Sequence, residues 1–203
     1  MRIVIGSQIK DISIFYMSEN ISHKKEVLLE KQVEPLFKAT RSGGAGNIFA
    51  ALLVYFLLKD SDQQVYAAYI SAAITILSLL RIVTSQFYIN NRSKLFFHLN
   101  IYVLLTLAIG VCWGMFAYMQ IYSDDETLRN LVLLINFGLI AASIATLSAW
   151  TMAYLAYMLP QSIAIFYIFM SIDSSYNVYM AVSYTHLTLP TTIELWGSGW
   201  GGG

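Results

Sequence analysis

The chain has 203 residues, of which 57% are hydrophobic and only 12% are charged, and its mean hydropathy is +0.60. Soluble domains carry about 25% charged residues, so a chain this poor in charge cannot cover the surface of a soluble globule. Twelve basic residues balance twelve acidic ones, which excludes the basic excess typical of nucleic-acid-binding proteins. The composition therefore indicates a membrane protein whose main partner is the lipid bilayer.

A charged leader, residues 1–41, precedes the first apolar run. Within it, residues 26–40 read EVLLEKQVEPLFKAT, and four apolar residues there share one face at helical spacing, namely Leu29, Val33, Leu36 and Phe37. This pattern predicts either an amphipathic helix on the membrane surface or a helical lead-in to the first span. Pro35 is expected to end or bend that helix.

Uncharged runs cover residues 42–58, 63–80, 95–123 and 130–172. A spanning helix needs roughly 20 apolar residues, so the first three runs hold one helix each and the fourth holds two. We therefore predict five helices, at about 43–59, 65–83, 101–121, 130–149 and 152–171. The runs are too long, and alternate too little, for barrel strands. The predicted fold is an all-α, multi-pass transmembrane bundle.

Glycine and proline mark two places in these helices. Gly43, Gly44 and Gly46 cluster at the predicted start of the first span and are expected to punctuate its entry. Pro160 falls inside the fifth span, where a kink is tolerable if neighbours satisfy the carbonyl that proline leaves without a donor.

The basic residues predict the orientation of the bundle. Seven of them lie in the leader, and Arg81, Arg92 and Lys94 are assigned to the end of the second helix and the loop that follows it. The opposite side has only Lys59 and Arg129. Because cytoplasmic loops are enriched in Lys and Arg, the N-terminus is expected in the cytoplasm.

The sequence contains no catalytic constellation, cofactor motif or metal-ligand set. His23, His98 and His186 have no neighbours with metal-ligand spacing, and the lone Cys112 is expected to be a packing residue in an apolar run. A charge near the middle of a span would indicate transport or proton relay. Arg81 comes closest, and we expect it to snorkel to the phosphate level from the inner end of the second helix.

Small and polar residues are the candidates for helix packing. Gly110 and Gly114 in GVCWG share one face of the third helix, and Ala141 and Ala145 have the same spacing in the fourth. These two faces are expected to pack together or to form a homodimer contact. Asn136, inside the fourth helix, is expected to make an interhelical hydrogen bond worth about 0.6–2 kcal/mol.

The C-terminal segment differs in character from the spans. Residues 182–191 read VSYTHLTLPT and resemble the translation of a transposase-type sequencing adapter, and the remaining TIELWGSGWGGG has low complexity. We therefore expect residues 182–203 not to be native, and the natural sequence to have been truncated near Ala181.

Residues 26–171 resemble the N-terminal membrane region of bacterial signalling proteins, including sensor histidine kinases and diguanylate cyclases or phosphodiesterases. The resemblance lies in the segments EVLLEKQ, GNIFAALLVYFLL, LLRIV, GVCWG and YLAYMLPQS. It departs from the family at KATRSGG, after Pro35, and the expected sixth helix is missing. It implies a sensory or anchoring module of the bacterial inner membrane, of the sensor-kinase type and without catalysis of its own. A small transporter or channel, or a structural membrane protein, are the alternatives.

Overall fold

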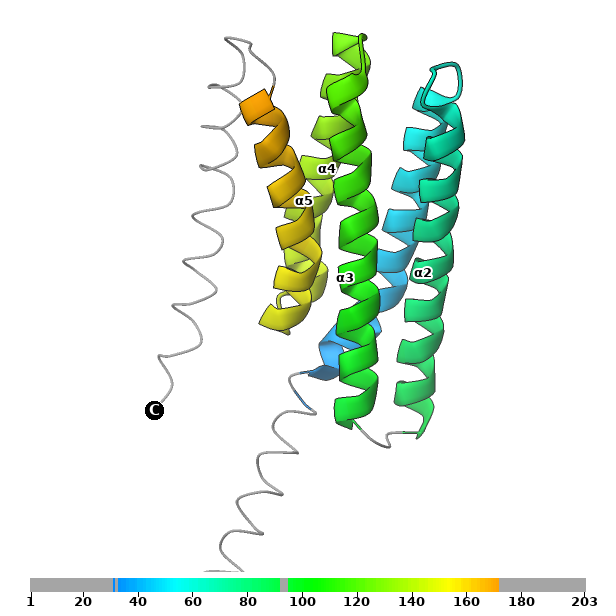
Figure 1. Ribbon diagram of the computed structural model, residues 1–203. Coiled ribbons are helices and arrows are strands. Elements are labelled where there is room, and N and C mark those ends of the chain that lie inside the picture. Colours follow the sequence, from blue (N-terminus) through cyan, green and yellow to red (C-terminus); the bar gives the residue numbers. More distant parts are fainter. Residues whose placement is uncertain (1–30, 32, 92–94, 172–203) are drawn as a thin grey trace, which may run out of the picture.

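The computed structural model describes residues 31, 33–91 and 95–171, and Figure 1 shows their helices running up and down side by side. Five helices of this part are long and apolar enough to cross a membrane. They are the first helix, Val33–Leu58, followed by α2 (Gln64–Asn91), α3 (Leu95–Met119), α4 (Glu126–Leu147) and α5 (Thr151–Ser171). The predicted all-α, multi-pass fold is confirmed. The tail at 182–203 and most of the leader lie outside the described residues.

The first helix does not begin at the glycine cluster. It passes through Pro35, Gly43, Gly44 and Gly46 without a break, as the alternative of a helical lead-in implied. In lipid no water competes for backbone groups, so glycine does not interrupt a helix as it does in a soluble protein. The missing side chain of Gly44 instead allows close packing, because a Cβ there would lie 2.6 Å from Cδ1 of Ile82.

α2 is longer than predicted. It runs to Asn91 rather than ending near residue 83, and α3 begins at Leu95 rather than at 101. The hydroxyls of Thr84 and Ser85 bond to the carbonyls of Leu80 and Arg81, each at 2.8 Å, within a continuous helix. The prediction assumed a span of roughly 20 residues and therefore stopped too early. As a result, Arg81 lies inside the helix instead of near its end.

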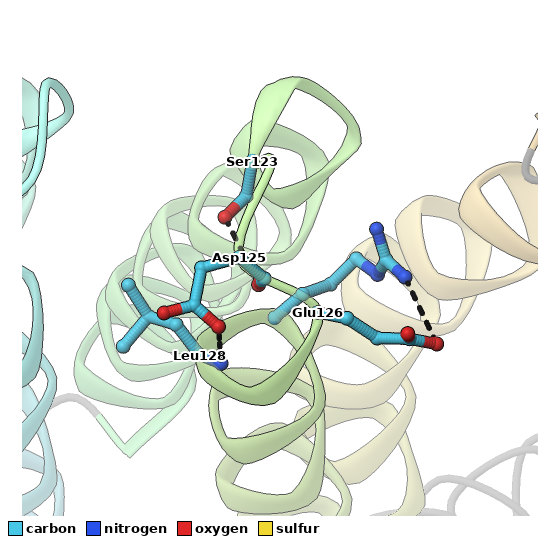
Figure 2. Close-up of polar contacts among 5 residues, drawn as sticks. Ser123, Asp125, Glu126 and Leu128 are labelled. Carbon is cyan, nitrogen blue, oxygen red and sulfur yellow. Dashed lines mark hydrogen bonds and ion pairs between the residues drawn. The ribbon is translucent and has the colours of Figure 1, made fainter.

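A capped turn separates α3 from α4 (Figure 2). A one-turn 3-10 helix, η1 (Gln120–Tyr122), extends α3, and the Asp125 carboxylate then accepts a 3.1 Å hydrogen bond from the backbone N–H of Leu128. The negative charge of the Asp125 carboxylate also interacts favourably with the positive, N-terminal end of the α4 helix dipole. Arg129 and Glu126 pair across the first turn at 3.6 Å. This cap explains why α4 begins at Glu126.

The bundle has an apolar outer surface in addition to a mainly apolar core. Large apolar residues cover the outside. Phe49, for example, is 70% exposed, and Phe87, Leu104, Ile163 and Phe166 are exposed as well. Polar residues are buried inside, among them Asn47, Arg81, Thr106, Asn136 and Gln161. Only an apolar solvent makes this arrangement favourable, because exposed apolar area of this extent would aggregate in water. The side-chain distribution therefore agrees with five membrane-spanning helices.

Among α2, α3, α4 and α5, the most extensive packing is between α3 and α5. A Cβ added to Gly110 would lie 2.5 Å from the carbonyl oxygen of Tyr157, and one added to Gly114 would lie 2.9 Å from that of Pro160. The two glycines thus let α5 approach α3 closely. Pro160 has no N–H and cannot donate a helical hydrogen bond to the carbonyl of Ala156, and this carbonyl also faces Gly110. The absence of a side chain on α3 is what permits this contact.

The expected pairing of the glycine face with the alanine face is not found within the described chain. Ala141 and Ala145 are exposed, because α4 turns Asn136, Ile140 and Ser143 inward instead. A homodimer contact through the two alanines stays a prediction.

Candidate functional site

A partly open cavity of about 180 Å³, lined by both apolar and polar residues, lies between the helices, and we call it the Arg81 chamber. The first helix, α2, α4 and α5 all contribute to its wall. Its polar lining consists of Ser42, Asn47, Arg81, Ser143, Thr146 and Tyr157. The volume is well above the roughly 10–15 Å³ that a cavity needs to hold one water molecule. The chamber is therefore large enough for a small polar molecule.

Asn47 holds three helices together at the wall of this chamber. Its side-chain oxygen accepts hydrogen bonds from Trp113 Nε1 at 2.8 Å and from the Tyr157 hydroxyl at 3.0 Å. Its amide nitrogen donates to the carbonyl of Gly43 at 2.9 Å. The indole N–H of Trp113 can only donate, so its contact fixes the orientation of the amide. Asn47 thus joins the first helix to α3 and α5 and has little capacity left for a ligand.

Arg81 is buried and incompletely bonded. Its side chain is only 2% exposed, and Nε has no hydrogen-bond partner. Nη1 lies 3.5 Å from Thr106 Oγ1, which is at the long limit for a hydrogen bond, and the guanidinium carbon lies 5.6 Å from the Tyr102 ring centroid. Among the described residues no carboxylate forms an ion pair with Arg81. Arg81 is therefore enclosed by protein and does not lie at the end of α2, from which we expected it to snorkel to the phosphate level.

Arg81 also lies deep along the helix axis. At 1.5 Å per residue it is about 25 Å from the start of α2 at Gln64 and about 15 Å from its end at Asn91. Arg41, in contrast, is exposed and donates a 2.7 Å hydrogen bond to Gln86, more than one turn nearer to that end. The two arginines thus differ in depth, and Arg81 is the one enclosed by protein.

The serine and threonine hydroxyl groups of the chamber already donate to backbone carbonyls. Ser143 Oγ donates to Ile140 at 2.6 Å, Thr146 Oγ1 to Ser143 at 3.3 Å, and Ser42 Oγ to Ala39 at 2.9 Å. A guanidinium carries five N–H donors and stays protonated at all accessible pH values. The unused donors of the chamber therefore belong mainly to Arg81. Arg81 makes the lining positively charged, because no acidic residue of the described part of the chain lines the chamber.

The lining of the chamber offers one cation and several hydrogen-bonding groups, which suit the binding of a small polar ligand. No group of three or more His, Cys, Asp or Glu within the described ranges is placed to hold a metal ion. The chain matches no family model, no curated protein and no solved structure.

The residues singled out from the sequence lie outside the chamber. Asn136 is fully buried, but its amide nitrogen donates to Val132 of its own helix at 3.0 Å, and Oδ1 has no partner in the described part of the chain. Gly110 and Gly114 lie at the contact between α3 and α5, and Ala141 and Ala145 face outward. None of these five residues lines the chamber.

Sequence reasoning missed Asn47, Trp113 and Tyr157 and misplaced Arg81. One signal for Arg81 was available, because ten uncharged residues, 82–91, separate it from the next basic residue, Arg92. That run is long enough to continue the helix well beyond Arg81.

Proposed function

We propose that the chain is the membrane-embedded sensory module of a bacterial signalling protein of the sensor-kinase type, and that it catalyses nothing itself. The Arg81 chamber is the observation that carries this proposal, because residues of four helices line it. A ligand bound between four helices stabilises the helix arrangement that it fits best. A sensory bundle works in this way, since a ligand shifts a conformational equilibrium only by its differential affinity for the two states.

The proposal places the N-terminus in the cytoplasm and the chain in the inner membrane. The contact between Arg41 and Gln86 brings the beginning of the first helix close to the end of α2. The N-terminal part of the first helix and the C-terminal part of α2 therefore lie on the same side of the bundle, and we expect the basic leader and the loop with Arg92 and Lys94 to extend from that side. This supports a cytoplasmic N-terminus by the positive-inside rule.

Recovery of the full-length gene from the source DNA tests the signalling function. We expect the reading frame to continue beyond codon 181 into a cytoplasmic output domain such as a kinase or a cyclase. In that full-length protein, Arg81→Gln should change the output activity, whereas Arg41→Gln should not. A frame that stops within a few residues of Ala181, or that continues into further spans without an output domain, would refute the proposal.

An anion transporter is the second candidate, and the burial of Arg81 favours it. Ionisable residues enclosed within membrane spans often mark substrate pathways. Reconstituted vesicles distinguish the two functions, because a transporter moves a radiolabelled anion across the membrane and a sensory module only binds it.

A further inference from the structure

We propose that the Arg81 chamber binds one compact oxyanion, a carboxylate or a phosphate group, through the guanidinium of Arg81. The inference deepens the proposed sensory function, on which it rests, by naming the chemical class of the ligand. It is carried by the burial of Arg81, by its unused donors and by the cavity beside it.

The charge of Arg81 requires compensation. A guanidinium remains charged when buried, and an unpaired buried charge is strongly unfavourable. The ring of Tyr102 and the long contact to Thr106 supply only a partial cation–π interaction and one weak hydrogen bond. No carboxylate among the described residues supplies the missing negative charge. An external anion in the chamber would supply it.

The lining favours an oxyanion over other ligands. Carboxylates and phosphates accept two parallel hydrogen bonds from one guanidinium, and Nε of Arg81 is a buried donor without a partner among the described residues. Asn47 is already bonded to Trp113, Tyr157 and Gly43, so it holds the helices of the chamber wall together and is not expected to bind the ligand. Leu139 and Leu147 line the same cavity and reduce its polarity, which strengthens the attraction between opposite charges.

Size and charge restrict the ligand further. A volume of about 180 Å³ accommodates a phosphate or a short-chain monocarboxylate. A dicarboxylate would bring a second negative charge for which the lining has no cation, so we expect it to bind more weakly. The same oxyanion chemistry can come from a free solute or from the phosphate of an anionic lipid, because the exposed residues Ser42 and Gly46 lie at the edge of the cavity.

Thermal unfolding in nanodiscs tests the proposal with the full chain. Wild type, Arg81→Gln and Arg81→Lys are compared, with Arg41→Gln as the matched control, since Arg41 is the exposed arginine that bonds to Gln86. One arm titrates inorganic phosphate, acetate and succinate at constant ionic strength into nanodiscs of phosphatidylcholine. The other arm replaces part of the phosphatidylcholine with phosphatidic acid, and native mass spectrometry counts the retained lipid.

We expect saturable stabilisation of the wild type by phosphate or acetate, or selective retention of phosphatidic acid. The first result identifies a free anion, and the second identifies a lipid headgroup. Arg81→Gln should weaken the apparent affinity by about 10- to 150-fold, the loss typical of a hydrogen bond to a charged group. Arg81→Lys should retain part of the affinity, and Arg41→Gln should retain all of it.

The proposal is overturned if neither anion nor anionic lipid stabilises the wild type, a result that does not require the variants to fold. It is also overturned if Arg81→Gln folds and binds as tightly as the wild type. Both results are independent of the full-length gene. An output domain without anion binding therefore refutes this inference alone, and anion binding without an output domain refutes the signalling function alone.

Discussion

The substitution Gly110→Ala is expected to force α3 and α5 apart. The added Cβ would lie 2.5 Å from the carbonyl oxygen of Tyr157 and 3.0 Å from that of Ala156. Ordinary contact begins at 3.4 Å, so the backbones must separate locally by about 0.9 Å, the difference between 3.4 and 2.5 Å. These are backbone atoms, which cannot rotate away as the end of a side chain can.

Overpacking of this kind costs about 1–3 kcal/mol, and the better helix propensity of alanine offsets at most about 1 kcal/mol of it. The loss should exceed that of Gly114→Ala, whose Cβ would lie 2.9 Å from the carbonyl oxygen of Pro160. Thermal unfolding in detergent measures the effect, at about 2–4 °C per kcal/mol for a chain of this size.

Gly138→Ala is the matched control, because Gly138 lies in α4 with nothing within 4 Å of an added Cβ. It should leave the unfolding temperature unchanged or raise it slightly. If Gly110→Ala were as stable as Gly138→Ala, the close contact between α3 and α5 would not exist in the membrane-embedded protein.

Three further predictions concern the chamber wall, the α4 cap and the topology. Asn47→Ala leaves the donors of Trp113 and Tyr157 unpaired and should destabilise the bundle by about 2–5 kcal/mol. Tyr157→Phe should cost about 1 kcal/mol. Equal unfolding temperatures for the two variants would contradict the role of Asn47. Asp125→Ala removes the cap of α4 and should cost about 1 kcal/mol in the same assay, and Asp124→Ala is the control that should cost less. In a Cys112→Ala background, an impermeant thiol reagent should label Asp125→Cys in intact cells and Asn91→Cys only after permeabilisation. Labelling of Asn91→Cys alone in intact cells would reverse the orientation.

The helical fold could be predicted from the sequence because it depends on composition. Long uncharged runs need lipid as a solvent, and in lipid only helices or closed barrels satisfy the backbone. The ends of the helices were harder to predict, since they depend on local contacts. The cap formed by Asp125 sets the start of α4, and the hydroxyl bonds of Thr84 and Ser85 accompany the continuation of α2.

The chamber could not be predicted, because it depends on which helices pack together. Asn47, Trp113 and Tyr157 come from three separate helices, and nothing in their spacing indicates that they meet. GVCWG did predict a close helix contact, but its partner is α5 at Pro160 rather than the alanine face of α4. A pattern of small residues shows that a face can be approached closely and does not show by which helix.

The position of an anion relative to Arg81 tests the central claim most directly. Solid-state NMR on the protein in lipid bilayers, with ¹⁵N-labelled arginine and either ¹³C-carboxylate acetate or ³¹P phosphate, measures the dipolar coupling between the guanidinium nitrogens and the anion. We predict a coupling that corresponds to direct hydrogen bonding, that is assigned to Arg81 by its absence in Arg81→Lys, and that persists in Arg41→Gln. Couplings to water protons alone, with none to carboxylate or phosphate at saturating concentration, would show that the chamber is only hydrated and would contradict the account.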